Sequence, residues 1–562
     1  MARVRRMRTQ EAKFWQSEYK VTEGDLDFLT GVILEGGLPR SLDDLVSVLM
    51  LRLIHREKER AARQVSDGEV YRPTDHFDVG QNLYFTERDF AQATVLHVRP
   101  GMNPRYPDFE VIRVAFEDGT ELEFASSLQV PHPLNRPTEE LVGGSAEDLS
   151  ETEIVDTYRV DVATALAQAL EADEGWVQFD GVWFLRELLP EFHMGHLNLA
   201  EAAIYEAGQP LPVSEMLSRL ELGIPGSRQA QLFSLNHSLS QDTRFDNVGT
   251  REGQVWYLRA LMPQEVFERP RVHQSPLSPT GEEYLGLTML DVVESLGDEL
   301  DSIAGMQTGN GSNIGYQVSF PHLYAGTMPA SAALLDLFAY EEGQHLAVTL
   351  IDARNNKSYA GWLLPAERYI AGLGPWYKAV GMVVGGLVSV APGDTPATLK
   401  LSITVSRSSS SGWVRSATVS DGALVLQMQP GRIAVRHDPA THIEVADRDA
   451  VARLMWQSQQ TSRSLYGLVK AVFAELAKLS PQGVAPCQAI YSAVNMYRRS
   501  GAVPIFSILT ANACFDPVGN GEWAFDGSLE GQQYQTPDQM RERPLSRRSD
   551  LARDQVVRYA GN

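Results

Sequence analysis

A helix followed by a β-hairpin is the pattern that the apolar and polar positions predict for residues 232–258. Apolar side chains recur at roughly helical spacing over 232–239, and Phe-Asp-Asn-Val-Gly at 245–249 breaks that periodicity. The run Val-Trp-Tyr-Leu at 255–258 is typical of a short strand. We therefore expect a helix, a turn and a hairpin in this stretch.

The same ending occurs twice more along the chain. Near the C-terminus, Phe-Asp-Pro-Val-Gly at 515–519 is followed by a second tryptophan-containing strand at 521–525. A weaker copy covers 175–185, where Asp180 and Gly181 suit the tip of a two-residue hairpin. The pattern predicts a module that the chain repeats.

Helical segments precede the first of these hairpins at 200–205 and, after a turn containing Gly and Pro, at 213–217. The helices and hairpin together resemble a winged helix-turn-helix. More narrowly, they resemble the winged-helix module of the delta subunit of bacterial RNA polymerase and of several chromatin and restriction proteins. The resemblance covers residues 190–262 and, more loosely, 465–526. Another kind of helical domain closed by a β-hairpin remains the alternative.

Residues 71–137 change to a β pattern. Four or five short runs of strand-forming residues, with a tight turn at 117–120, predict a small barrel of SH3-like size. Small barrels serve as peptide-binding, nucleic-acid-binding or purely structural modules, so the predicted fold does not choose between these roles.

The region 284–440 is β-rich again. One predicted strand ends at Asp352, Trp362 lies in the next, and Gly-Pro-Trp-Tyr follows at 374–377. This order resembles the B3-type pseudobarrel of plant transcription factors and some restriction enzymes, although Gly-Gly replaces the Gly-Asp pair usual in that family. A generic β-barrel is the alternative.

Two stretches of distinctive composition separate the regions described above. Pro, Gly and acidic residues gather in one stretch and Pro with polar residues in another, which predicts two linkers. The expected fold class is multidomain α+β, with repeated winged-helix-like modules and small β-barrel domains. The expected order is a basic arm and helical module (1–70), a small β-barrel (71–137), an acidic linker (138–156), a winged-helix-like region (157–265), a linker (266–283), a β-rich pseudobarrel (284–440), a second winged-helix-like region (441–530) and a disordered tail (531–562).

Arginines near the N-terminus are the candidate DNA contacts. Those from position 52 onward fall on one face of a predicted helix, where guanidinium groups match the charge of a nucleic-acid backbone. Interspersed Glu and Lys residues leave a solvated helix laced by ion pairs as the alternative, and a solubilising tail is the alternative for the basic arm. The candidates are Arg3, Arg5, Arg6, Arg52, Arg56, Arg60 and Arg63.

The formal net charge of −23 argues against a protein that coats nucleic acid along its whole surface. We therefore expect DNA contacts to be local, and an acidic chain also suits a protein partner with a basic surface. No apolar run reaches the roughly 18 residues of a membrane span, and no apolar signal core follows the N-terminal arginines. These features predict a soluble, cytoplasmic protein without membrane contact.

The sequence carries no recognisable motif of enzyme chemistry. It has neither a G-x-x-x-x-G-K-[ST] phosphate loop nor G-x-S-x-G, and Cys487 and Cys514 lack a histidine at usable spacing. His193 and His196 could ligate a metal, but no carboxylate accompanies them at usable spacing, so a helix start is the preferred interpretation. No catalytic residue, metal or cofactor is expected.

Two functional hypotheses follow from these features. The first is a non-enzymatic, multi-module DNA-binding protein, an adaptor or a regulator of transcription, whose modest local contacts add up through tethering. The second is an acidic protein-interaction scaffold that docks on transcription or other nucleic-acid machinery. An enzyme with an unrecognised site is a third possibility.

Overall fold

The computed structural model describes most of the chain. The described residues are 7–66, 69–85, 88, 91–135, 149–220, 224–251, 253–275, 284–301, 314–404, 412–461 and 463–541. They belong to two compact units: an N-terminal unit of residues 1–196 and 221–238, and a C-terminal unit of residues 197–220 and 239–562. No helix in the described segments combines the length and apolarity that crossing a bilayer requires.

One element order occurs three times: a helix, a short strand, two more helices and a hairpin. Module 1 consists of α1 (Glu23–Gly36), β1 (Arg40–Ser41), α2 (Leu42–Ser66), α4 (Glu151–Ala172), β7 (Trp176–Phe179) and β8 (Val182–Leu185). Module 2 consists of α5 (Met194–Ala207), β9 (Leu211–Pro212), α6 (Val213–Leu220), α7 (Arg228–Ser240), β10 (Phe245–Asn247) and β11 (Val255–Leu258). Module 3 consists of α14 (Leu465–Ala477), β22 (Val484–Pro486), α15 (Cys487–Val494), α16 (Ala502–Ala511), β23 (Phe515–Gly519) and β24 (Glu522–Phe525).

The three modules also share one strand order. In each, the short first strand pairs antiparallel with the last strand of the hairpin, which gives the sheets β1-β8-β7, β10-β11-β9 and β22-β24-β23. The hairpins expected near 175–185, 245–258 and 515–525 are therefore confirmed. The winged-helix resemblance itself stays a prediction.

Two of the hairpins turn through left-handed backbone at their tips. Asp180 and Gly181 have φ values of 50° and 70°, and Asn520 and Gly521 have φ values of 53° and 74°. Two successive residues with positive φ make the turn whose twist matches the flanking strands, and Asp-Gly and Asn-Gly tolerate it best. The Asp-Gly tip predicted from the sequence is thus confirmed.

Module 1 carries an inserted sheet between its second and third helices. The insert consists of β2 (Glu69–Val70), β3 (Asn82–Phe85), β4 (Ala91–Pro100), β5 (Glu110–Phe116) and β6 (Glu121–Ser126), paired in that order. It has its own apolar core, which includes Leu83, Val95 and Ile112. The strands expected in 71–137 are confirmed.

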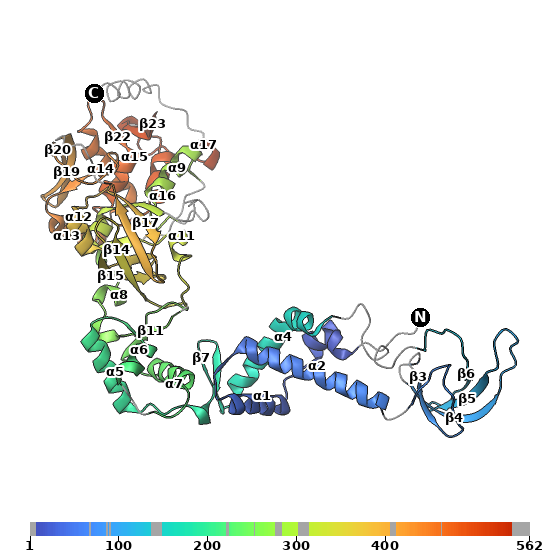
Figure 1. Cartoon of the computed structure of the whole chain (residues 1–562). Coiled ribbons are helices and arrows are strands. Elements are labelled where there is room, and N and C mark those ends of the chain that lie inside the picture. Colours follow the sequence, from blue (N-terminus) through green and yellow to red (C-terminus); the bar gives the residue numbers. More distant parts are fainter. Residues whose placement is uncertain are drawn as a thin grey trace. The chain divides into compact units, whose positions relative to one another are not determined.

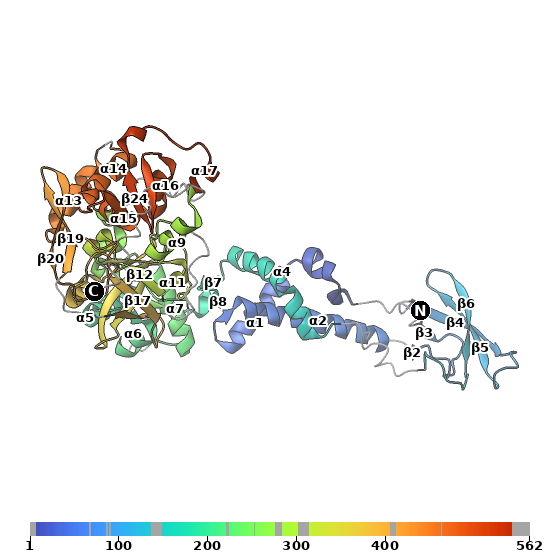
Figure 2. The same ribbon diagram turned by 90° about the horizontal axis from the view of Figure 1, so that it is seen from above.

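The expected boundary at 157 is wrong, because α4 and the hairpin β7–β8 share a core with α1 and α2. Leu29 and Leu49 belong to the same buried cluster as Ile154, Leu166 and Trp176. Figures 1 and 2 both show α1, α2 and α4 lying together. The sequence interpretation failed here because the insert separates the two halves of one module.

The prediction of an acidic linker over 138–156 is wrong for residues 151–156, which are helical. The helix α4 begins at Glu151, where Ser150 and Glu153 form a capping box and Ile154 and Val155 are buried. Carboxylates in the first turn of a helix are stabilised by its dipole, so an acidic run there marks a helix start as well as a linker. Residues 136–148 lie outside the described residues.

A barrel-like sheet of seven strands dominates the middle of the C-terminal unit. Its order is β12-β17-β18-β14-β15-β16-β13, in which β14 and β18 are parallel and the other neighbours antiparallel. The strands are β12 (Ile314–Gln317), β13 (Thr327–Pro329), β14 (Leu346–Asp352), β15 (Lys357–Leu364), β16 (Tyr369–Ala371), β17 (Leu387–Pro392) and β18 (Thr398–Ile403). A β-rich, barrel-like region was expected here. The narrower resemblance to the B3 family stays a prediction.

Helices and a second small sheet surround these strands. The further helices of the unit are α8 (Gln264–Phe267), α9 (Leu287–Leu296), α10 (Phe320–Ala325), α11 (Ala332–Leu335), α12 (Gly374–Val380), α13 (Arg448–Gln459) and α17 (Pro537–Arg541). The second sheet is β20-β19-β21, made of β19 (Gly412–Ser420), β20 (Ala423–Gly431) and β21 (Glu444–Val445). Short 3-10 or π turns lie at Arg8–Gln10, Phe14–Glu18, Arg186–Leu188, Arg259–Leu261, Arg271–His273 and Gly527–Leu529.

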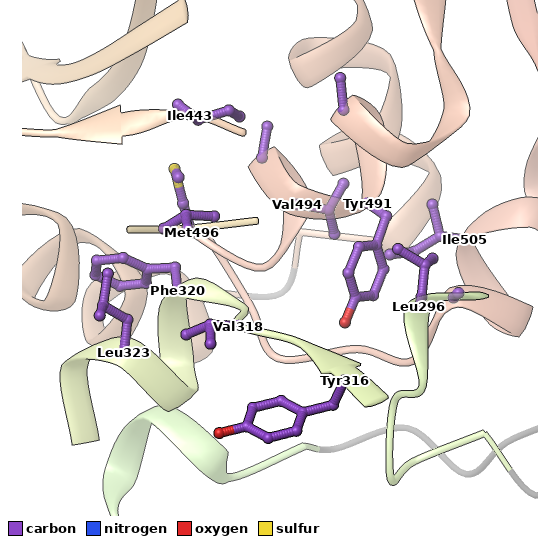
Figure 3. Close-up of a cluster of buried hydrophobic side chains, with 14 of the residues drawn as sticks. Leu296, Tyr316, Val318, Phe320, Leu323, Ile443, Tyr491, Val494, Met496 and Ile505 are labelled. Carbon is purple, nitrogen blue, oxygen red and sulfur yellow. The ribbon is translucent and has the colours of Figure 1, made fainter. Parts of the chain in front are cut away.

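One hydrophobic core runs through the barrel-like sheet and module 3. Leu350 of β14 and Trp376 of α12 belong to the same buried cluster as Ile490 of α15 and Phe506 of α16. The cluster of Figure 3 shows side chains from α9, β12, α10, α15 and α16 gathered together. The expected separation of 284–440 from 441–530 is therefore wrong, because the two regions bury their apolar faces in one core.

The linker expected at 266–283 is wrong in its first part, since Val266, Val272 and His273 are all buried. The proline of the turn Arg271–His273 precedes its first residue, where a missing backbone N–H costs nothing. Composition predicted a linker here, yet three side chains of this stretch are buried. Residues 276–283 lie outside the described residues.

The prediction of a disordered tail over 531–562 is wrong for residues 531–541, which the structure describes. Backbone hydrogen bonds from Ala513 to Gln532 and from Tyr534 to Ala511 fix its first residues, and α17 buries Met540. These contacts hold residues 532–540 against the rest of the unit. Residues 542–562 lie outside the described residues.

Candidate functional site

The arginines predicted to contact DNA fall into three groups. Arg3, Arg5 and Arg6 lie outside the described residues, and so do the side chains of Arg60 and Arg63, although their backbone continues α2. Arg56 is exposed on α2, whereas Arg52 is half-buried. The structure thus places one of the seven side chains, Arg56, on the surface of α2.

Arg52 is engaged within the N-terminal unit. Its guanidinium donates a hydrogen bond of 2.9 Å to the carbonyl oxygen of Gly24 and lies 3.6 Å from the carboxylate of Asp25. The same group stacks over the ring of Phe28, 4.2 Å from its centroid. These contacts join α2 to α1, so Arg52 has a packing role that competes with any contact to phosphate.

Other basic groups of α2 face a carboxylate of α4. Lys58 lies 2.6 Å and His55 3.2 Å from the carboxylate oxygens of Glu151. A hydrogen bond from Lys58, followed by the nearby positive charge, lowers the pKa of Glu151. Ion pairs therefore link α2 to α4, in agreement with the ion-pair alternative.

The third helix of each module has little positive charge. On α4 the exposed residues include Glu153, Asp156 and Asp161, with Val160 exposed to 76%. In α7 the only basic residues are Arg228 and His237, and α16 contains no charged residue and is mostly buried. The three third helices are thus acidic, neutral and largely inaccessible, in that order.

His193 and His196 form the helix start that the sequence indicated. The His193 ring nitrogen Nδ1 accepts a hydrogen bond from the backbone of Gly195, and its carbonyl oxygen accepts one from His196. The two rings stack with centroids 3.7 Å apart. Burial, followed by the neighbouring His193, lowers the pKa of His196.

A buried polar cluster in the C-terminal unit was not anticipated from the sequence. It joins the turn Arg271–His273, the residues that follow α9, the α10–β13 segment and the α15–α16 segment. Its members are His273, Asp298, Glu299, Asp301, His322, Thr327, Tyr491, Asn495 and Arg499, all of them buried. No motif spacing could have found it, because its members come from four distant segments.

Arg499 is the cationic member of this cluster. Its guanidinium makes two hydrogen bonds to the carboxylate of Asp298, of 2.7 and 2.5 Å, and lies 2.8 Å from Glu299. It also donates to the side chain of Asn495 at 3.1 Å, and the hydroxyl of Tyr491 donates to Asp298 at 2.5 Å. The planar guanidinium has several N–H donors, so it can donate to both carboxylates at once.

A chain of hydrogen bonds leads from Glu299 to His273. Glu299 Oε2 lies 3.0 Å from His322 Nε2, and His322 Nδ1 lies 2.8 Å from the hydroxyl of Thr327. The same hydroxyl lies 2.8 Å from His273 Nε2. An ionised Glu299 can only accept a hydrogen bond, so His322 Nε2 carries the proton of this bond. The hydroxyl of Thr327 forms hydrogen bonds with both imidazoles.

Burial and charge set the protonation of the two ends of this chain. Burial, followed by the neighbouring His322, lowers the pKa of His273 well below its ordinary value. Burial would raise the pKa of Glu299, but Arg499 and His322 outweigh it and hold that pKa well below its usual range. The chain therefore has an ionised carboxylate at one end and a neutral imidazole at the other.

Aromatic hydroxyls and a helix cap complete the surroundings. The hydroxyl of Tyr377 donates to the backbone carbonyl of Thr327 at 2.8 Å, and the hydroxyl of Tyr316 lies 3.1 Å from that of Tyr377. Asp301 accepts hydrogen bonds from the backbone of Ala502 and Val503 at the start of α16. Figure 3 shows Tyr316 and Tyr491 among the apolar side chains of the hydrophobic core.

The cluster is a buried network of ion pairs and hydrogen bonds. Its side chains are buried, so in this conformation they cannot contact a molecule in solution. Three of them could serve as ligands of a metal ion, because one ligand atom each from His273, Glu299 and His322 all lie within 4.8 Å of one another.

The chain matches no family model, no curated protein and no solved structure. Its function is therefore inferred from its own residues and geometry.

Proposed function

We propose that the protein is a non-enzymatic adaptor, built from winged-helix-type modules, that docks on a basic partner protein of the transcription or other nucleic-acid machinery. The observation that carries this proposal is the surface of the third helices: α4 is acidic, α7 is nearly neutral and α16 is mostly buried. Modules that read DNA through this helix place it in the major groove, where phosphates line both edges. An acidic or buried helix is unsuited to that position.

The repeated element order supports the winged-helix part of the proposal. Three modules share both the order of helices and strands and the pairing of the first strand with the last. Winged modules have this arrangement. The module is repeated, but its third helix lacks the positive charge that DNA binding needs. This combination favours a scaffold.

The exposed face of α4 is the surface on which we place the partner. Asp156 and Asp161 lie on either side of Val160, an apolar side chain that is 76% exposed. An apolar contact flanked by carboxylates suits a partner whose own apolar contact is flanked by Lys or Arg. The net charge of −23 adds long-range attraction for such a partner.

The experiment begins with chemical cross-linking of the full chain in its native extract, followed by reconstitution of the binary complex from purified proteins. In that complex the double variant Asp156→Lys, Asp161→Lys should bind at least about tenfold more weakly, equivalent to ~1.4 kcal/mol. The matched control is Glu341→Lys, Glu342→Lys, which reverses two exposed charges in the C-terminal unit. Equal affinities of the two variants would remove α4 from the interface.

Local DNA binding is the second candidate, and the exposed position of Arg56 favours it. Binding of the intact chain to random duplex DNA should be measured over a salt series. Binding that weakens steeply with salt, and is lost in Arg56→Gln, Arg60→Gln, Arg63→Gln, would favour DNA as the main partner. Arg52 is left unchanged in this variant, because its contacts with α1 would confuse binding with folding.

A further inference from the structure

Two imidazoles and one carboxylate meet in the buried polar cluster, and they come from three separate segments. His273 ends a 3-10 turn, Glu299 follows α9 and His322 lies in α10. One ligand atom from each lies within 4.8 Å of the other two. Nitrogen and oxygen donors in this combination suit a divalent transition metal such as zinc.

One ring nitrogen of His273 makes no hydrogen bond within the part of the chain that the structure describes. Its Nε2 lies 2.8 Å from Thr327, but its Nδ1 has no hydrogen-bond partner among the described residues. The side chain is buried, with 2% of the residue exposed. A buried polar atom without a partner is costly, and a neutral imidazole is the form that binds metal.

The charges of the cluster leave room for a further cation. The carboxylates of Asp298 and Glu299 both lie against the single guanidinium of Arg499. A buried carboxylate beyond the number of partner cations is unfavourable unless another positive charge neutralises it. A divalent ion beside Glu299 would supply that charge.

The neighbours of the three ligands hold them in place. Arg499 lies 2.8 Å from Glu299 Oε1, which leaves Oε2 directed at His322, and Thr327 bonds to both imidazoles. The 3.0 Å between Glu299 Oε2 and His322 Nε2 is close to the roughly 3.3 Å that separates neighbouring ligands on tetrahedral zinc. Outer contacts of this kind orient metal ligands in proteins.

We propose that His273, Glu299 and His322 form a binding site for one zinc-like divalent ion. On binding, the hydrogen bond between His322 Nε2 and Glu299 is replaced by two bonds to the ion. The proton of His322 moves from Nε2 to Nδ1, which then donates to the hydroxyl oxygen of Thr327, so the imidazole stays neutral. The ion ties the turn Arg271–His273 and the residues after α9 to α10. It therefore acts as a structural ion that links the start of the C-terminal core to its barrel-like sheet.

The test uses the full chain, stripped with a chelator and titrated with Co²⁺ as a visible probe and with Zn²⁺. We expect one equivalent of each ion to bind and the Co²⁺ spectrum to show nitrogen and oxygen ligands without thiolate bands. His273→Gln and His322→Gln should each abolish this binding. His193→Gln removes the stacked surface pair and His442→Gln removes another buried imidazole, and both should leave the binding unchanged.

Several results would overturn the proposal. They are no stoichiometric binding to the wild-type chain, unchanged binding in both cluster variants, or loss of binding in His193→Gln, which would make the ion an adventitious surface ion only. If the cluster variants fail to fold, the thermal midpoint of the wild-type chain with and without Zn²⁺ tests the proposal. Zn²⁺ at a hundredfold excess over its Kd should then raise the thermal midpoint of the C-terminal unit by mass action, and no rise would refute the site.

Discussion

Arg499 is the residue whose loss the C-terminal unit should tolerate least. It is buried and donates to Asp298 and Glu299, so Arg499→Met would leave two buried carboxylates without their cation. We expect a loss of about 3–5 kcal/mol in the free energy of unfolding of this unit, measured by calorimetry. The control is Arg498→Met, since Arg498 is also buried but donates to the backbone carbonyl of Ser458 at 3.3 Å. Equal losses in the two variants would contradict the importance of the ion pairs.

Asp352 at the end of β14 makes stability depend on pH. Its buried carboxylate lies 2.6 Å from the guanidinium of Arg354, and this hydrogen bond lowers the pKa of Asp352 below the usual 3.8 despite burial. A carboxyl whose pKa is lowered by folding stabilises the protein above its unfolded pKa, and this contribution disappears as pH falls through the folded pKa.

Asp352→Asn should therefore cost about 1–3 kcal/mol near neutral pH and flatten the acid limb of the stability curve below about pH 4. The measurement is the thermal midpoint of the C-terminal unit between pH 2 and pH 7. Asp394→Asn is the matched control, because Asp394 is exposed and its pair with Lys400 is screened by water. An acid limb unchanged by Asp352→Asn would show that this pair does not govern it.

At the scale of elements, the three modules place a tryptophan at one equivalent position. Trp183, Trp256 and Trp523 are each the second residue of the last hairpin strand, and each is paired with a residue of the short first strand. All three are buried. Each indole is therefore a buried side chain at the same position of the hairpin.

Replacing any one of these tryptophans by alanine should destabilise the unit that contains it by about 3–5 kcal/mol. Circular dichroism and calorimetry would detect the loss, while the other unit should keep its transition. The control is Trp413→Ala, since Trp413 is 70% exposed and truncating it leaves no cavity. If Trp256→Ala or Trp523→Ala keeps full stability, the equivalence of the modules is wrong.

The elements that sequence could predict are those with local signals. Asp180 and Gly181 marked a hairpin tip, and the strand with Trp523 followed from the similarity of 515–525 to 245–258. The strand pairing of β1 with β8 could not be predicted, because more than a hundred residues separate the two. The buried cluster was missed for the same reason, since His273 and Arg499 meet only through the fold.

At the scale of the molecule, a Pro-rich stretch did not mark a boundary between domains. Residues 266–283 were expected to form a linker, yet Val272 lies in the core of the C-terminal unit and His273 is buried beside it in sequence. Apolar side chains on both sides of a proline can be buried as long as its missing N–H is not needed. Domain limits in this chain therefore follow from shared core residues and not from composition.

The region 284–440 is for this reason expected not to fold alone. Its barrel-like sheet shares one buried cluster with α14, α15 and α16, and Glu299 lies against Arg499. A fragment ending at 440 would expose that apolar surface and leave the carboxylates of Asp298 and Glu299 without their cation, which favours a loosely packed state. A fragment of residues 197–541, in which residues 221–238 are retained, keeps the whole core. It should unfold in one cooperative transition. Calorimetry and binding of a hydrophobic dye compare the two fragments, and a cooperative transition in 284–440 would contradict the shared core.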